Sequence, residues 1–272
     1  MRTVLGAVDP PLIHIATANI RRPVPRLLTR AADRWERRGP ALARRLERER
    51  PTVLGAQEVF PGPAEMMLAA LGSSYARVGE GRQRGRRGEG CPVFYDRDRL
   101  ELLESRQLAL SDAPEVAGSM SWGNPMPRVM VVAAFRERFD GRRFSVVNTH
   151  LDPFSPRSRV RSSEAIRATV RAAGAPAVVL GDMNAAAGST ALRALQRGDL
   201  LVDAWGAAAE RVTPAWGTFA GYRAPTRGGA RIDWILTTPD ITVERIAIDG
   251  RPEDGIAPSD HLPLHAAIEV PR

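Results

Sequence analysis

The stretch Ala177-Val-Val-Leu-Gly-Asp-Met-Asn184 has four apolar residues followed by a turn that carries an aspartate and an asparagine. A short apolar run bounded by turn residues is typical of a buried strand. We expect a helix before it, at Ser158–Ala173, so that a helix leads into the strand and the strand ends in polar side chains. This arrangement of a buried strand with a polar end recurs along the chain.

Other segments have the same character. We expect one helix to begin at Gly39-Pro40, because proline is tolerated in a first turn. We expect a second helix at Pro63–Leu71. The further predicted strands are Ile13–Asn19, Thr52–Ala56, Pro92–Tyr95, Val129–Phe135, Phe144–Thr149, Ile232–Thr237, Ile241–Ile248 and His265–Val270. Strands and helices mix without the strict alternation of a barrel or a doubly wound sheet, which favours mixed sheets covered by helices. Without an evident repeat or a Pro/Ser-rich linker, we expect one domain over residues 1–272.

The composition excludes several classes of protein. With 43% apolar and 26% charged residues in 272, global disorder is excluded. The one cysteine, Cys91, excludes an internal disulfide framework and a zinc site built on several thiolates. The first residues lack the uninterrupted apolar core of a signal peptide, and no apolar run approaches membrane-spanning length. We therefore expect a cytoplasmic protein that does not interact with a membrane.

The basic residues of the chain are all arginine, and they give a formal net charge of +8. Residues 21–50 hold 11 arginines against four acids, and residues 82–87 hold four more arginines. One interpretation is a solvated helix face and a loop, with arginine favoured by a GC-rich genome. The other is an electropositive rim that attracts a phosphorylated substrate.

Polar residues of a similar kind end or punctuate the apolar stretches. Each alone is typical of a turn or a helix cap. Together they supply oxygen ligands and imidazoles without thiolates, which is the ligand set that suits Mg²⁺ or Mn²⁺ better than zinc. These residues are Asn19, Glu58, Asn148, His150, Asp182, Asn184, Asp233, Ser259, Asp260 and His261.

In this order along the chain, the motifs resemble the endonuclease/exonuclease/phosphatase superfamily. The matching blocks are Thr17-Ala-Asn19-Ile20, Gly55-Ala-Gln57-Glu58, Gly88-Glu89-Gly90, Pro127-Arg128, Asn148-Thr-His150-Leu-Asp152, Gly181-Asp182-Met-Asn184, Arg231-Ile-Asp233-Trp-Ile-Leu and Ser259-Asp260-His261-Leu-Pro. The resemblance covers nearly the whole chain. It implies a four-layer α/β/β/α sandwich, in which two mixed β-sheets pack face to face between helices.

The resemblance also implies roles for the acidic and amide residues. Glu58 is expected to be a ligand of Mg²⁺ or Mn²⁺, with Asn19 and Asp260 completing or flanking the metal site. Asp182 and Asn184 resemble the pair that orients the attacking water and grips a phosphate oxygen or a second metal.

Two histidines are expected near the scissile phosphate, each with a carboxylate partner that fixes its tautomer. The resemblance pairs His261 with Asp233 and His150 with Glu89; which histidine is acid and which is base stays open. The other two histidines, His14 and His265, lie inside predicted strands, and we expect structural roles for them.

The substrate contacts follow from the same resemblance. Arg128 is expected to clamp a phosphate oxygen, since a planar guanidinium suits phosphate, and Asn148 to hold the site through hydrogen bonds and contribute to substrate binding. Four aromatic residues are placed near the pocket rim, where they either stack on the substrate or pack in the core: Trp122, Trp216, Phe219 and Tyr222. The segment Arg21-Arg22-Pro23-Val24-Pro25 departs from the more polar loop of many relatives.

The favoured hypothesis is a Mg²⁺- or Mn²⁺-dependent phosphoesterase that hydrolyses a phosphodiester or phosphomonoester, with a phosphorylated small molecule or nucleotide as substrate. A nuclease acting on DNA or RNA is the alternative, supported by the arginine-rich segments 21–50 and 82–87. A second alternative is a non-hydrolytic binding protein, or one repurposed in a pathway, on the same fold.

Overall fold

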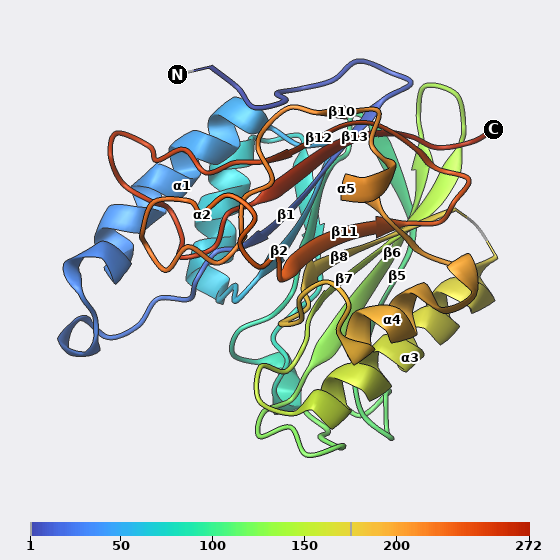
Figure 1. Ribbon diagram of the computed structural model, residues 1–272, viewed down its shortest axis with the longest axis horizontal. Helices are drawn as coiled ribbons and strands as arrows, with labels where there is room; N and C mark the ends of the chain where they lie inside the picture. Colours follow the sequence, from blue (N-terminus) through green and yellow to red (C-terminus); the bar gives the residue numbers. More distant parts are fainter. Residues whose placement is uncertain (1, 175) are drawn as a thin grey trace.

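Two β-sheets lie face to face, and helices cover the outer face of each (Figure 1). The computed structural model describes residues 2–174 and 176–272. The first sheet has the strand order β10-β12-β13-β1-β2-β4-β3, with bounds β1 Ile13–Asn19, β2 Val53–Gln57, β3 Tyr75–Val78, β4 Val93–Asp96, β10 Glu210–Arg211, β12 Thr242–Ile248 and β13 Leu264–Glu269. The second has the order β5-β6-β7-β8-β11-β9, with bounds β5 Leu100–Ala109, β6 Val129–Glu137, β7 Arg143–His150, β8 Ala177–Asp182, β9 Val202–Asp203 and β11 Asp233–Thr237.

Both sheets are mixed, as predicted. Strand β1 pairs parallel with β2 and antiparallel with β13, and β8 pairs parallel with β7 and antiparallel with β11. Helices α1 and α2 pack on the first sheet and α3 and α4 on the second, as Figure 1 shows at the two sides of the molecule. The helix bounds are α1 Trp35–Glu49, α2 Pro61–Leu71, α3 Pro156–Ala173, α4 Thr190–Gln196 and α5 Ala204–Ala207. The four-layer α/β/β/α prediction is confirmed. No helix among the described residues has the length and apolar composition to cross a bilayer.

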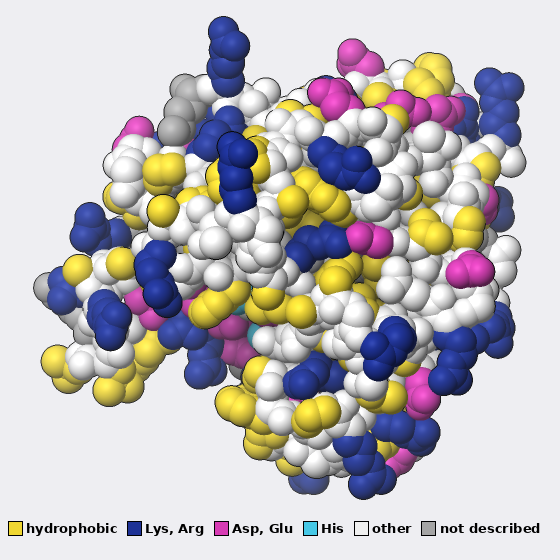
Figure 2. Space-filling model, viewed as in Figure 1, with side chains coloured by type: hydrophobic (Ala, Val, Ile, Leu, Met, Phe, Trp, Pro, Cys, Tyr) yellow, Lys and Arg dark blue, Asp and Glu magenta, His cyan; other side chains and the backbone are white. Residues whose placement is uncertain are grey.

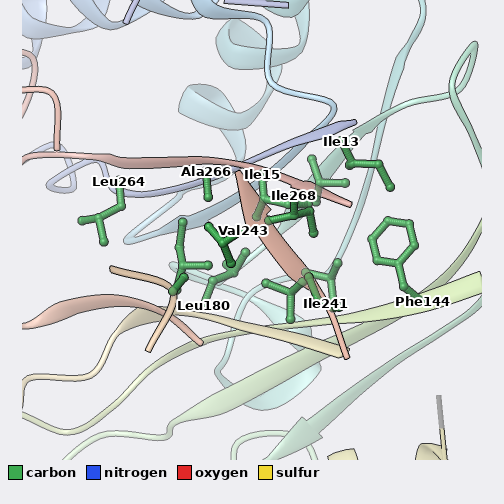
Figure 3. Packing of buried hydrophobic residues seen from close by; sticks show 14 of the residues in the cluster. Ile13, Ile15, Phe144, Leu180, Ile241, Val243, Leu264, Ala266 and Ile268 are labelled. Carbon is green, nitrogen blue, oxygen red and sulfur yellow. The ribbon is translucent and has the colours of Figure 1, made fainter. Parts of the chain in front are cut away.

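The apolar core between the sheets follows from the two-residue period of the strands. In β13, Leu264, Ala266 and Ile268 all face the other sheet, because alternate side chains lie on one face. Figure 3 shows these residues packed with side chains of the second sheet, among them Leu180. Burial of this aliphatic surface is the main force that holds the sheets together.

A buried polar contact joins the sheets near the ends of β2 and β7. Gln57 Nε2 donates to Asn148 Oδ1 over 2.7 Å, and Asn148 Nδ2 donates to the carbonyls of Ala56 and Pro92 at 3.0 and 2.9 Å. Both side chains are fully buried. Gly55 makes the close approach possible, since a Cβ there would lie 1.9 Å from Leu180 Cδ1. We call Gln57 and Asn148 the amide clasp.

The start of α1 differs from the sequence prediction. The helix begins at Trp35, so Pro40 lies inside it and Gly39-Pro40 is not its start. The side chain of Arg38 is fully buried and donates to the carbonyls of Ile20 and Pro258 at 3.0 and 3.1 Å. These tertiary contacts hold the helical turn before the proline.

Some elements were not predicted from the sequence. Strand β5 lies at a sheet edge and its middle residues 103–106 are all exposed, so it lacks the alternation that marks a half-buried strand. Strands β3, β9 and β10 and helices α4 and α5 are short, and their patterns are correspondingly weak.

Replacing Gly55 with alanine tests the close approach of the sheets. Because the new Cβ meets Leu180 and Asn148, we expect Gly55→Ala to lower the free energy of unfolding by at least ~2 kcal/mol. Gly62→Ala is the matched control, since nothing lies within 4 Å of its Cβ, and we expect it to be neutral or to stabilise by up to about 1 kcal/mol. Urea unfolding measures both; equal effects would contradict the steric argument.

The buried histidine pair gives the fold a pH-dependent stability. His14 Nε2 lies 3.0 Å from His265 Nδ1, and both rings are inaccessible to solvent. Burial, together with the charges of His265 and Arg245, lowers the pKa of His14 well below its usual value. The unfolded chain therefore takes up a proton near pH 6.5 that the folded chain does not, so stability falls as the pH drops below about 6.5.

We expect the free energy of unfolding to fall by up to ~1.4 kcal/mol per pH unit for each such histidine as the pH drops from 6.5 towards 5. Urea unfolding at a series of pH values measures this slope. His14→Gln should reduce the slope even if it also destabilises the protein. An unchanged slope in this variant would show that His14 is not the source.

Candidate active site

The polar strand ends meet at one edge of the two sheets. Asn19 ends β1, His150 ends β7 and Asp182 ends β8, while Asp233 begins the antiparallel strand β11. In the register of the second sheet, Asp182 lies beside both His150 and Asp233. Figure 2 shows acidic side chains (magenta) and a little histidine (cyan) in a hollow near the centre of one face, with arginines (dark blue) around it.

Asn19 connects the carboxylates of the two sheets. Its Nδ2 donates to Glu58 Oε1 and to Asp182 Oδ2, each at 3.1 Å. Its Oδ1 accepts from the backbone N–H of Arg21 at 2.9 Å. The amide oxygen is therefore already engaged, and in this structure Asn19 acts as a donor that positions two carboxylates; its role as a metal ligand stays a prediction.

Glu58 and Asn184 occupy strained backbone positions. Their φ angles are 61° and 45°, in the left-handed region that costs a non-glycine residue about 1 kcal/mol or more. Glu58 Oε2 accepts from the backbone N–H of Arg22 at 3.0 Å, and the N–H of Asn184 donates to Asp182 Oδ1 at 2.9 Å. The side chain of Glu58 thereby reaches Asn19, whereas Nδ2 of Asn184 donates to the carbonyl of Leu151 at 2.9 Å.

Asp182 lies between two imidazoles. His150 Nε2 is 3.4 Å and His261 Nε2 is 3.8 Å from Asp182 Oδ2. The other ring nitrogen of His261, Nδ1, is 2.9 Å from Asp233 Oδ2, so the structure brings together the carboxylate–imidazole pair that was predicted. This hydrogen bond leaves Nε2 of His261 facing the centre of the site.

The two imidazoles have opposite charge states. Burial opposes a charge on His261, but the charge and hydrogen bond of Asp233, with Asp182 and Asp260, raise its pKa to about 10. Burial, followed by the charges of Arg128 and Arg82, lowers the pKa of His150 well below its usual value. At neutral pH His261 is an imidazolium and His150 is a neutral imidazole.

The carboxylates carry more negative charge than their surroundings balance. Burial and the charge of Asp233 raise the pKa of Asp182 to about 7, and burial also raises the pKa of Asp260. Asp233 Oδ1 is buried and has no hydrogen-bond partner among the described residues. Such a group of oxygen donors fits a hard divalent cation, whose charge would offset their mutual repulsion. Asp182 and Asp233 lie in one group with the ring of His261, which is protonated and so not available as a ligand. Glu58 and Asp260 are the further carboxylates beside them that could hold the cation.

The predicted pairing of Glu89 with His150 is wrong. Glu89 instead forms ion pairs with Arg82 at 2.5 Å and Arg22 at 3.3 Å, and no hydrogen bond joins it to His150 among the described residues. The guanidinium groups are permanently charged whereas His150 is neutral, so the carboxylate gains more from the arginines. The polar neighbour of His150 is Asp182.

Two buried arginines line the side of the site near His150. Arg128 and Arg82 are 3% and 5% exposed, and each has a buried nitrogen without a hydrogen-bond partner, Nη1 and Nε respectively. Arg128 is held through Nε by Asp152 at 3.3 Å. These unused donors suit phosphate oxygens. In the sequence, the motif Pro127-Arg128 singled out Arg128. Nothing distinguished Arg82 from the other arginines of segment 82–87.

Asn148 lies behind the site and not in it. It is fully buried, and its amide is used by Gln57 and by backbone carbonyls, as described above. Its amide is used by partners within the protein, and its predicted contribution to substrate binding stays a prediction.

Arg21, which lies in the segment that departs from the loop of many relatives, connects the active site to its rim. Arg21 forms an ion pair with Asp33 at 3.0 Å and lies 3.8 Å from Asp260. Tyr222 Oη donates to the same Asp33 over 2.6 Å. The ring of Phe219, which is 55% exposed, lies edge-on to His261 with centroids 5.0 Å apart. No sequence motif marked Asp33, since its role depends on contacts with distant segments.

Comparisons with known proteins agree with this geometry. The model of the Endonuclease/Exonuclease/phosphatase family matches residues 16–261. A Bacteroides vulgatus endonuclease/exonuclease/phosphatase is 29% identical, with TM-score 0.88 over 96% of this chain and 99% of that one. A Bacteroides thetaiotaomicron mannosyl-6-phosphatase is 25% identical, with TM-score 0.87 over 94% and 99%. D. rerio TDP2 with a single-strand DNA product is 17% identical, with TM-score 0.69 over 95% and 99%, which shows the fold alone. No curated protein matches the chain.

The charge state of His261 is testable by removing its partner. In Asp233→Asn the dominant favourable charge is lost, so we expect the pKa of His261 to fall from about 10 to near or below its ordinary ~6.5. NMR titration of the ring proton in metal-free protein measures this, with His261→Gln to assign the resonance. Asp240→Asn, an exposed site, is the control. A His261 titration that is the same in both variants would contradict the assignment.

Proposed function

The chain belongs to the endonuclease/exonuclease/phosphatase family, and from this premise we propose that it is a Mg²⁺- or Mn²⁺-dependent phosphoesterase. The favoured substrate is a phosphorylated small molecule or nucleotide, as a monoester or diester. The observation that carries the proposal is the division of the site into an acidic half and a basic half.

The acidic half contains Glu58, Asp182, Asp233 and Asp260, and the basic half contains Arg82 and Arg128 with unpaired buried donors. A phosphate ester placed between them meets cation-binding oxygens on one side and guanidinium groups on the other. Such an arrangement stabilises the charge that develops on the phosphoryl oxygens during in-line displacement.

Glu58, Asp182 and Asp260 are the carboxylates that would hold the divalent cation. When bound, the cation supplies polarisation of a phosphoryl oxygen and lowers the pKa of water. Asn19 keeps Glu58 and Asp182 together by donating to both, so the two sheets present their carboxylates as one unit.

We assign to Asp182 the role of orienting the attacking water. The N–H of Asn184 and the amide of Asn19 fix its carboxylate, so that it can accept a hydrogen bond from the water and orient it. His261, held as an imidazolium by Asp233, offers Nε2–H to a phosphoryl or leaving oxygen. His150 is neutral and contributes through its contact with Asp182.

The use of the arginines favours a small substrate over nucleic acid. In segment 21–50, Arg38 and Arg45 are buried and Arg48 pairs with Glu253, so these three do not offer free charge to a polyanion. The similarity to a mannosyl-6-phosphatase also supports a phosphorylated metabolite as the substrate.

A nuclease remains the second candidate, supported by the exposed arginines that line the hollow in Figure 2. A non-hydrolytic role on the same fold, as a binding protein or in a repurposed pathway, is less consistent with a site that assembles carboxylates, imidazoles and unpaired arginine donors.

We expect purified protein to hydrolyse small phosphoesters with Mg²⁺ or Mn²⁺ and to lose the activity in EDTA. Glu58→Gln and Asp182→Asn should each lower kcat/KM at least ~100-fold, about 2.7 kcal/mol of transition-state stabilisation. The exposed Glu65→Gln is the matched control and should be unaffected. Activity that survives EDTA, or an active Asp182→Asn enzyme, would overturn the proposal.

A substrate panel separates the candidates. Sugar phosphates, nucleotides and single-stranded DNA and RNA are compared at low and high salt. A nuclease would prefer the polymers and lose affinity steeply with salt. A binding protein without hydrolytic activity would still gain thermal stability from Mg²⁺ or Mn²⁺ but show no turnover on any substrate.

A further inference from the structure

A second cavity lies behind the loop that carries Asp260 and His261. Its volume is about 610 Å³, within the range of small-molecule sites. Three segments line it: residues 31–45 of the turn and helix α1, the loop 220–225 and the loop 249–262. Figure 1 shows them as the blue helix α1 and the orange and red loops beside it.

A wall separates this cavity from the catalytic carboxylates. The backbone N–H groups of Ala220 and Gly221 donate to the carbonyl of Asp260 at 2.9 and 3.0 Å, and the side chain of Tyr222 is fixed by Asp33. Tyr222 and His261 line the cavity, whereas Glu58 and Asp182 are not among its lining residues. The cavity and the catalytic centre therefore share one wall.

The net charge of the cavity is positive. Arg45 and Arg251 line it, but both lie beside the buried Asp249, at 3.7 and 2.8 Å, and are balanced by it and neighbouring carboxylates. Arg37, from α1, and Arg223, from the opposite loop, are exposed. Neither has a side-chain hydrogen bond or ion pair with any described residue, so two guanidinium groups are free to bind an anion.

The remaining surface of the cavity is largely apolar. Its lining includes the side chains of Pro225, Ile256, Ala257, Pro258 and Leu262. An apolar surface with a few placed charges is typical of a pocket for an organic ligand, because the apolar part supplies binding energy and the charges fix its orientation.

We propose that this cavity is a binding site for a small organic anion. The apolar body of the ligand packs on the proline and aliphatic side chains, and its carboxylate, sulfonate or phosphate group pairs with Arg37 and Arg223. Since the ligand also contacts Tyr222, it braces the wall that holds Asp260 and His261. This site does not depend on the phosphoesterase proposal.

Direct binding of 1-anilinonaphthalene-8-sulfonate to the full chain tests the site, because the dye combines an aromatic body with one anionic group and fluoresces when buried. We expect one saturable site with a Kd below about 1 mM. In the double variant Arg37→Ala/Arg223→Ala the Kd should rise at least ~10-fold. Arg171→Ala/Arg272→Ala removes the same charge from exposed positions outside the cavity and should bind the dye as the native chain does.

Ala257→Phe fills the cavity without removing charge and should weaken dye binding to a similar extent; circular dichroism confirms that each variant is folded. Hydrogen exchange should show that the dye protects the backbone of residues 220–223. Asp182→Asn should leave dye binding unchanged, which separates this site from the catalytic one. Absence of saturable binding, equal affinity in the two arginine double variants, or protection confined to other segments overturns the proposal.

Discussion

The amide clasp between Gln57 and Asn148 is the contact on which the rest of the site depends. It is a hydrogen bond between two fully buried side chains, one from each sheet, and the remaining amide groups of Asn148 are satisfied by backbone carbonyls. Oε1 of Gln57 is buried without a hydrogen-bond partner among the described residues, but breaking the bond to Asn148 would leave further buried polar atoms unpaired, so the pair admits few alternative alignments of the sheets. Gly55 supplies the space for it. The clasp lies one residue before Glu58 and two before His150, and it thereby brings the ends of β2 and β7 to a common edge.

Charge separation within the site follows from this alignment. The first sheet contributes Glu58 and the second contributes Asp182, and Asn19 donates to both carboxylates. Burial, together with the charge of Asp233, raises the pKa of Asp182 to about 7. The fold maintains this repulsion because the groups are fixed by strands whose stability comes from the apolar core. The opposing arginines are fixed in the same way by Glu89 and Asp152.

The arginines of this chain serve structure as much as surface charge. Arg38 is fully buried and ties α1 to two loops through backbone carbonyls, and Arg45 and Arg251 flank the buried Asp249. A guanidinium is suited to this task because its five donors can reach several acceptors at once. The net charge of +8 therefore overstates the positive surface available to a ligand. Among the described residues, few guanidinium groups are free to bind a ligand. Their positions distinguish the hollow of the catalytic site from the cavity behind it.

The sequence by itself determined the main strands and the polar residues at their ends, because these depend on local patterns. Its resemblance to the family implied the pairing of Asp233 with His261, which the structure brings together. It placed the start of α1 too late and missed β5, since Arg38 and the sheet edge act through tertiary contacts. It also paired Glu89 with His150, where Arg82 and Arg22 take the carboxylate. Only the tertiary structure decided which donors are used and which are free, because a side chain's partner is set by distance across the fold. Gln57 and Asn148, like Asn19 and Asp182, are far apart in the chain and become neighbours only when the sheets close.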